Sequence, residues 1–269
     1  MNRTGISEAS GLPIGEIIGL NILYDITAFD RGHIWYQGCT SIVAENAKGE
    51  IFHGRNLDYE MGDLLKNITV MLDFKKDGNI LYSGTSFALY NGLLTGQRPN
   101  AYTVTLNERY SGAYIDTILM ELYTHFNRPV TIFIREVLES ESTFKGAVLK
   151  LSSTSLIAPS YIIVGGMKSG EGAVISRSRL KAADVEFLDA KNDRWFLIET
   201  NFDHWKRDID GRRTKAMSYL QSIGFDHLTA SGMNSTLDQI PVRNNLTLYS
   251  TVLSAKDPNL FFETFRVLD

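Results

Sequence analysis

Two groups of strand-like runs, separated by a helical block, constrain the fold of this chain more than any other feature of the sequence. The first group lies within residues 40–106 and the second within 161–267, and apolar residues at three- and four-residue steps fill the interval. Strands and helices do not alternate one by one, as they would in a parallel βαβ sheet. The pattern predicts an α+β fold with mainly antiparallel sheets.

The expected elements follow from apolar spacing and turn signals. We expect the ranges 185–188 and 195–200 to pair with each other around 189–193, and the glycine-rich segment 165–170 to be a hairpin loop, because it lacks the spacing of a phosphate-binding loop. The predicted helices are 12–27, 113–126, 130–138, 144–151 and 212–222, and the predicted strands are 40–44, 50–59, 68–74, 79–83, 101–106, 161–165, 172–176, 185–188, 195–200, 246–254 and 260–267.

Composition limits the class of protein. The chain has 269 residues, 43% of them hydrophobic and 22% charged, which is ordinary for one globular domain with a large core. A formal net charge of −4 argues against binding to nucleic acid through a broad basic surface. The single cysteine excludes an intrachain disulfide and a thiolate-cluster metal site, and we expect no cofactor and no metal.

That cysteine, Cys39, precedes a predicted hairpin in which paired positions sum to about 95. Cys39 then lies near Asn56, beside Arg55 and Asp58. A neighbouring cation favours the thiolate, which is the reactive form, although a free cysteine is more often buried and inert. Residues three apart on a regular strand face opposite sides, so Arg55 and Asp58 can both reach Cys39 only if a bulge or the strand end lies near Leu57.

A Cys-His hydrolase is the main alternative type of enzyme. The five histidines show no metal-ligand spacing and no local cysteine-protease motif, and we expect most of them to be surface or capping residues. His204 is the best candidate for a base, because it follows Asn201 by three residues. The histidines are His33, His53, His125, His204 and His227.

Several motifs in a fixed order resemble the catalytic subunit of acid ceramidase and of N-acylethanolamine-hydrolysing acid amidase. The resemblance runs from about Ile6 to the C-terminus. The motifs are GCTSIV at 38–43, GRNLDY at 54–59, LTGQ at 94–97, NER at 107–109, IVGG at 163–166, ETNFDHW at 199–205 and RRT at 212–214. This family belongs to the N-terminal-nucleophile hydrolases, which implies a four-layer αββα sandwich.

The resemblance implies cleavage between Gly38 and Cys39. Residues 1–38 would then be the remnant of an N-terminal subunit that stays as a partner, and residues 39–269 would be the catalytic subunit. The freed α-amino group of Cys39 could serve as general base, since its reference pKa is about 7.7–8.0. The sequence departs from the family pattern in nine extra residues, 30–38, directly before the cysteine.

The resemblance also assigns roles to further side chains. Arg55 belongs to the surroundings of the nucleophile, and Asp58 orients the new amino group. Asn201 donates to the oxyanion that forms as the thiol attacks. Arg212 closes the site near Asn201, and Glu108 matches a buried acid that fixes the asparagine.

The implied reaction is hydrolysis of a fatty-acid amide through a thioester on Cys39. The short segment after Asp58 favours N-acylethanolamines over ceramide, which remains the alternative substrate. Ceramide would need a groove for its second long chain. A catalytically silent product is an alternative of another class, because the extra residues 30–38 alter the cleavage site.

The family resemblance suggests a lysosomal protein, yet the N-terminus lacks the apolar region of a signal peptide, and we expect that its natural start has been lost. No run reaches the roughly 20 apolar residues that cross a bilayer. The helix at 12–27 is expected to cover the core, although peripheral contact with lipid membranes is physically reasonable. Four N-glycosylation sequons hint at secretion, and they begin at Asn2, Asn67, Asn234 and Asn245.

Overall fold

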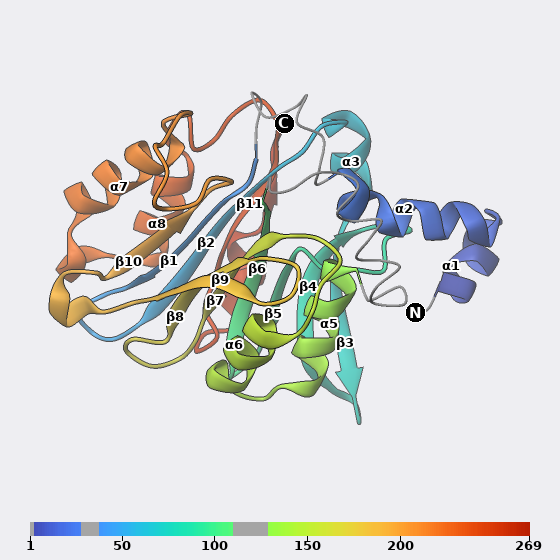
Figure 1. Cartoon of the computed structure of the whole chain (residues 1–269), viewed down its shortest axis with the longest axis horizontal. Coiled ribbons are helices and arrows are strands. Elements are labelled where there is room, and N and C mark those ends of the chain that lie inside the picture. The colour runs from blue at the N-terminus through green and yellow to red at the C-terminus, as the bar shows by residue number, and fades with distance from the viewer. Residues whose placement is uncertain (1–2, 28–37, 110–128) are drawn as a thin grey trace.

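The computed structural model describes residues 3–27, 38–109 and 129–269, and it places two antiparallel sheets face to face between helices (Figure 1). The five-stranded sheet has the order β10-β1-β2-β11-β12, and the seven-stranded sheet runs β3-β4-β5-β6-β7-β8-β9. Helices α7 and α8 cover the first sheet, and α5 and α6 cover the second. The predicted four-layer α+β sandwich is confirmed.

The described elements follow in chain order. The helices are α1 (Arg3–Ser10), α2 (Ile14–Thr27), α3 (Gly62–Ile68), α5 (Val130–Ser140), α6 (Phe144–Ser153), α7 (Arg212–Ile223), α8 (Ala230–Leu237) and α9 (Asn259–Thr264). The strands are β1 (Thr40–Glu45), β2 (Ile51–Asp58), β3 (Thr69–Lys76), β4 (Asn79–Phe87), β5 (Thr95–Arg98), β6 (Tyr102–Glu108), β7 (Ser160–Gly165), β8 (Gly172–Arg177), β9 (Ala182–Phe187), β10 (Phe196–Glu199), β11 (Thr247–Leu253) and β12 (Arg266–Val267).

Strand β1 shows why the layers form. Successive side chains of a strand point to opposite faces, so Ile42 and Ala44 pack under α7 and α8, whereas Val43 packs between the sheets against Ile163. Every residue of β1 is buried. A strand with apolar residues on both faces needs a cover on each side, and the second sheet and the helices provide it.

The β1–β2 hairpin has almost the predicted register. Thr40 pairs with Asn56 and Ile42 with Gly54, so paired positions sum to 96 rather than 95. The turn is fixed by Asn46, whose Oδ1 accepts hydrogen bonds from the main-chain N–H groups of Lys48 and Glu50, both at 3.0 Å. The hairpin therefore sets Cys39 beside the end of β2 through local sequence alone.

Two predictions of secondary structure are wrong. Ranges 185–188 and 195–200 do not form a pair: β9 is an edge of the seven-stranded sheet, and β10 pairs with β1 in the other sheet. Residues 259–264 form helix α9 instead of a strand. Of the predicted strand 260–267, Arg266–Val267 alone pairs with β11. Helices α1, α3 and α8 and strand β5 were not predicted.

The other expected elements within the described residues are confirmed to within a few residues, including the hairpin loop at 165–170. The predicted helix 113–126 lies outside the described residues. None of the helices within residues 3–27, 38–109 and 129–269 has the length and the apolar character that crossing a membrane requires.

Candidate active site

Cys39 lies at the start of β1 and is 6% exposed. Its Sγ atom is 3.9 Å from the main-chain oxygen of Asp58, at the end of the neighbouring strand. Burial raises the pKa of the thiol, and the charge of Asp58 acts in the same direction, whereas Arg55 and Arg212 lower it. The two guanidinium groups thus oppose the desolvation of a thiolate at this position, although burial has the larger effect.

Arg55 comes from β2 and is fully buried. Its Nη1 donates to the Ser41 hydroxyl at 3.0 Å and to Oδ1 of Asn107, and its Nη2 donates to the main-chain oxygen of Leu106 at 2.7 Å. These bonds span the two sheets. They fix the guanidinium near the Cys39 thiol, whose pKa it lowers.

Asp58, the last residue of β2, is buried at 3% exposure. Its Oδ2 accepts a hydrogen bond of 2.7 Å from Asn244 and lies 3.9 Å from Nη1 of Arg212, while its Oδ1 has no hydrogen-bond partner in the described part of the chain. Burial raises the pKa of Asp58 to about 6, against the opposing effects of Arg212, Thr247, Asn244 and Arg55.

An irregularity in β11 accompanies the arrangement of Arg55 and Asp58. Asp58 pairs with Thr247 and Leu57 pairs with Tyr249, so one residue of β11 is extra at this point. Such a bulge increases the local twist and redirects the neighbouring side chains. We expected a bulge or the strand end near Leu57: β2 ends at Asp58, and the irregularity lies in the partner strand β11.

Arg212 is the first residue of α7, after Gly211, which adopts a left-handed φ of 76°. Its Nη1 donates to the main-chain oxygens of Gly38 and, at 2.8 Å, Cys39, and its Nη2 donates to Oδ1 of Asn201 at 3.1 Å. Asp210 holds the same guanidinium through an Nη2–Oδ2 contact of 2.8 Å. One arginine therefore contacts the carbonyl oxygens of both peptide bonds of Cys39, the one that joins it to Gly38 and the one that joins it to Thr40.

Asn201 follows β10 and is 3% exposed. Its Nδ2 donates to the main-chain oxygen of Glu108 at 2.8 Å, so a hydrogen bond links these two residues. A Cβ atom at Gly38 would overlap the Asn201 side chain. Only glycine fits before the cysteine in this arrangement.

Asn107 is a buried residue of the site that sequence reasoning missed. Its Nδ2 donates to the main-chain oxygens of Cys39 at 3.3 Å, Glu199 at 2.8 Å and Thr200 at 2.9 Å, and its Oδ1 accepts from Ser41 at 2.9 Å. It therefore ties β6 to β1 and β10. The available signal was its place in the NER motif, directly before Glu108.

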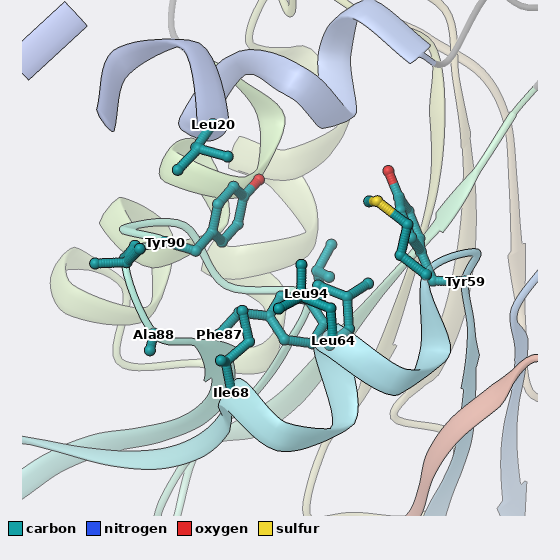
Figure 2. Close-up of a pocket in the computed structure, with 11 residues that line it drawn as sticks. Leu20, Tyr59, Leu64, Ile68, Phe87, Ala88, Tyr90 and Leu94 are labelled. Atoms are coloured by element: carbon teal, nitrogen blue, oxygen red, sulfur yellow. The ribbon is translucent and has the colours of Figure 1, made fainter. Parts of the chain in front are cut away.

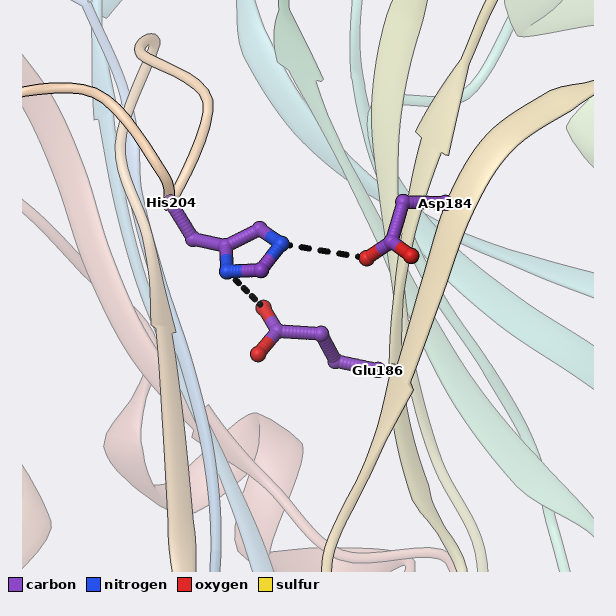
Figure 3. Close-up of side chains that lie close together, drawn as sticks. All are labelled: Asp184, Glu186 and His204. Atoms are coloured by element: carbon purple, nitrogen blue, oxygen red, sulfur yellow. Dashed lines mark hydrogen bonds and ion pairs between the residues drawn. The ribbon is translucent and has the colours of Figure 1, made fainter.

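His204 does not face Cys39. Its Nε2 lies 3.1 Å from Asp184 Oδ2 and its Nδ1 lies 3.3 Å from Glu186 Oε2, as Figure 3 shows. The three side chains could hold a metal ion by proximity. Each ring nitrogen faces its own carboxylate, on a different part of the molecule from Cys39. The Cys-His alternative receives no support from this geometry.

The remaining histidines divide between core and surface. His53 is buried, and its ring nitrogens lie 2.8 and 2.9 Å from the hydroxyls of Thr103 and Thr105. Burial, aided by Arg55, lowers the pKa of His53 to about 3. His53 is therefore an exception to the expectation that most histidines are surface or capping residues. His227 is exposed, and His33 and His125 lie outside the described residues.

An apolar pocket of about 270 Å³ opens between α2, α3 and the segment at 87–94 (Figure 2). The pocket lies close to the end of β2, because Tyr59, the residue after Asp58, forms part of its wall. The side chains that line it are almost entirely apolar and include Leu20, Tyr59, Leu64, Ile68, Phe87 and Leu94. Such a pocket fits an alkyl chain.

Residues 39–224 match the model of the linear amide C–N hydrolases, choloylglycine hydrolase family. An N-acylethanolamine-hydrolyzing acid amidase of Caenorhabditis elegans is 59% identical over 249 residues, which cover 93% of this chain and 70% of the relative. The corresponding amidase of Cavia porcellus is 40% identical, with 98% and 72% covered, and human acid ceramidase is 36% identical, with 97% and 68% covered.

Solved structures agree with this assignment. The Caenorhabditis elegans N-acylethanolamine-hydrolyzing acid amidase ortholog superposes with a TM-score of 0.80 at 54% identity, covering 86% of this chain and all of that one. A penicillin V acylase of Agrobacterium tumefaciens, at 12% identity, a TM-score of 0.51 and coverage of 85% and 83%, shares the fold. This chain therefore belongs to the choloylglycine hydrolase family of linear amide C–N hydrolases and is an N-terminal-nucleophile amidase.

Proposed function

We propose that this amidase hydrolyses fatty-acid amides, N-acylethanolamines in particular, through a thioester on Cys39. Cys39 becomes catalytically competent after cleavage of the bond between Gly38 and Cys39. The observation that carries the proposal is the contact of Arg212 with the carbonyl oxygens of both residues. A cation at the Gly38 oxygen stabilises the negative charge that develops there when a nucleophile attacks its carbonyl carbon.

The cleavage step follows from that contact. The Cys39 Sγ attacks the Gly38 carbonyl carbon, the C–N bond to Cys39 breaks, and the nitrogen takes a proton to leave as the α-amino group. Water then hydrolyses the thioester between Gly38 and Cys39, which frees the Gly38 carboxylate and the thiol. Only glycine fits against Asn201 before the cysteine, so the extra residues 30–38 end in a residue compatible with this geometry.

The same groups serve the amide substrate. Cys39 Sγ attacks the acyl carbon, its α-amino group carries the proton to the leaving amine, and water hydrolyses the thioester to a fatty acid. Asn201 and Arg212 lie beside the scissile carbonyl and would bind the oxyanion. The Oδ1 atom of Asp58, which has no hydrogen-bond partner among the described residues, is available to accept a hydrogen bond from the new amino group.

The apolar pocket supports a long acyl chain as the part of the substrate that is bound. Discrimination then falls on the amine side, where ethanolamine needs less room than the second long chain of ceramide. The segment between Asp58 and β3 is short and contains only α3, which offers little material for a second groove. Relatives named for N-acylethanolamines are also more similar to this chain than acid ceramidase.

Residues 1–38 would remain attached as the smaller subunit. Ile17 of α2 is fully buried, and Asn21 donates to the main-chain oxygen of Leu89 at 3.0 Å and accepts from the N–H of Asn91 at 2.6 Å. Tyr90, between those two residues, lines the acyl pocket. Release of the fragment would therefore remove one wall of the pocket.

Exposed apolar side chains at the pocket suggest transfer of substrate from a membrane surface. Three exposed side chains line the pocket: Leu20 of α2 is 43% exposed, Met61, directly before α3, is 54% exposed, and Leu64 of α3 is 56% exposed. Amphipathic surfaces of this kind can lie in the lipid interface. A lysosomal setting fits relatives that are named acid amidase and acid ceramidase, and exposed sequon residues Asn67 and Asn245 could carry glycans.

The test compares the wild-type chain with Cys39→Ala by intact-mass spectrometry and by hydrolysis of N-palmitoylethanolamine and ceramide between about pH 4 and 8. We expect a wild-type fragment that begins at Cys39, an acidic optimum and faster cleavage of N-palmitoylethanolamine. Cys39→Ala should stay intact and inactive. An active Cys39→Ala protein would refute the nucleophile, an intact and inactive wild type would establish the silent alternative, and a preference for ceramide would refute the substrate.

A further inference from the structure

Asn244 contacts the acid of the site from a segment that the sequence did not mark. It lies between α8 and β11, and its Nδ2 donates a hydrogen bond of 2.7 Å to Oδ2 of Asp58, 186 residues away in the chain. It is only half-buried and lines a polar pocket of about 360 Å³ at the surface. Substitutions at this position can therefore be accommodated more easily than in the core.

The orientation of the Asn244 amide is set by its own turn. Its Oδ1 accepts from the N–H of Leu246 at 3.0 Å, and its main-chain N–H donates to the hydroxyl of Thr247 at 3.0 Å. Because the amide oxygen is occupied as an acceptor, the amide nitrogen is the group that faces Asp58. Thr247 also pairs with Asp58 across β11 and β2, which anchors the turn to the site.

Asp58 consequently has two unequal oxygens. Oδ2 is held by Asn244 and lies 3.9 Å from Arg212, whereas Oδ1 is buried without a hydrogen-bond partner among the described residues. We propose that Asn244 is a positioning residue for amide hydrolysis, which holds Oδ2 so that Oδ1 stays directed at the α-amino group of Cys39. This inference rests on the proposed function, since that amino group exists only after cleavage.

The charge balance around Asp58 gives the inference a measurable consequence. The ionisable groups that face Asp58 are Arg212 from α7, Arg55 from β2 and Cys39, which directly precedes β1. Burial raises the pKa of Asp58 to about 6, and the hydrogen bond from Asn244 opposes this rise. Loss of that bond raises the pKa further, and a second carboxylate at position 244 raises it more.

The experiment measures kcat, KM and their pH dependence for processed Asn244→Leu and Asn244→Asp with N-palmitoylethanolamine. We expect kcat to fall about tenfold or more with KM little changed, because a charge-assisted hydrogen bond is lost. The acidic limb of the profile should shift to higher pH, further for Asn244→Asp. If Asn244→Leu does not fold, Asn244→Asp, which keeps the shape of the side chain, carries the test.

Asn192 provides the matched control. Its Nδ2 also donates to an aspartate Oδ2 at 2.7 Å, in an exposed turn, so Asn192→Leu and Asn192→Asp should leave kcat and the pH profile unchanged. The variant Asp58→Asn distinguishes an error in the role of Asn244 from an error in the proposed site. If Asp58→Asn is inactive while both Asn244 variants match the wild type, the inference is wrong and the proposed site stands. If Asp58→Asn is fully active, the proposed site is wrong.

Discussion

The two walls of the active site are built in different ways. Cys39, Arg55 and Asp58 come from one hairpin of about 20 residues, whose pairing is fixed by its turn and its alternation. Asn201 comes from the irregular loop between β10 and α7, and Arg212 is the first residue of α7. The first wall depends on backbone pairing, whereas the second has no ladder of hydrogen bonds and depends on side chains that hold its carbonyls.

Two neighbouring arginines illustrate the second wall. Arg212 reaches into the site, whereas Arg213 donates to the main-chain oxygens of Phe202, Asp203 at 3.5 Å and His204 at 3.4 Å. The Asp203 carboxylate is in turn held by Arg109 Nε at 2.7 Å, the Tyr161 hydroxyl at 2.7 Å and Lys206 Nζ at 2.9 Å. The turn after Asn201 is thus fixed from two sides. We therefore expect the second wall, called the loop wall, to be more sensitive to a change outside the site than the first wall, called the hairpin wall.

The largest effect on the loop wall should come from Asn201→Ala. Loss of one oxyanion donor lowers turnover by about 10²–10³-fold, and the fold should persist because no ladder bond is removed. Steady-state kinetics on processed enzyme, with thermal unfolding in parallel, measures both. Asn192→Ala, in an exposed turn, is the control. An unchanged kcat in a processed Asn201→Ala enzyme would show that Asn201 does not bind the oxyanion.

A smaller effect should follow from Arg213→Met, compared with Arg177→Met. Both side chains are buried and donate to main-chain carbonyls, but Arg177 serves Ser152 and Thr154 at the end of α6. Both variants leave buried acceptors unpaired and should lower the free energy of unfolding by about 1–3 kcal/mol. Only Arg213→Met should also lower kcat, by about tenfold, at a temperature where both proteins are folded. Equal kcat values for the two variants would contradict the positioning of the loop by Arg213.

The smallest effect on catalysis is expected for Glu199→Gln, whose consequence is a change in stability. Glu199 is fully buried on β10, its carboxylate oxygen lies 3.9 Å from Arg213, and burial raises its pKa from 4.5 to about 8. The folded state binds this proton more tightly than the unfolded state. Its contribution to stability is therefore complete below pH 4.5 and is lost as the pH rises to about 8, by about 1.4 kcal/mol per pKa unit.

Urea unfolding at pH 4.5, 6 and 8 measures that contribution. Glu199→Gln stays neutral, so its stability should decline less over this range than that of the wild type. Glu263→Gln removes an exposed carboxylate and should keep the wild-type slope. A Glu199→Gln protein with the wild-type slope would show that Glu199 of β10 does not hold a buried proton.

Prediction from the sequence succeeded where neighbours in the chain decide the structure. The alternation of β1 and β2 and the turn at Asn46 fixed a register within one residue pair of the expected one. It failed where distant segments decide. The range 185–188 and the range 195–200 look like a hairpin around a polar turn, but each strand finds its partner in a different sheet. Residues 259–264 carry an apolar run too short to distinguish a helix from a strand.

The site divides along the same line. Sequence by itself identified the proposed nucleophile Cys39, its neighbour Arg55 and the family, because these depend on residue identity and on one local hairpin. Only the tertiary structure decided which groups hold the Asp58 carboxylate, because Asn244 and Arg212 arrive from segments more than 150 residues away. Spacing along a chain cannot specify such contacts, since they arise only when separate layers pack and each buried polar group must find a partner.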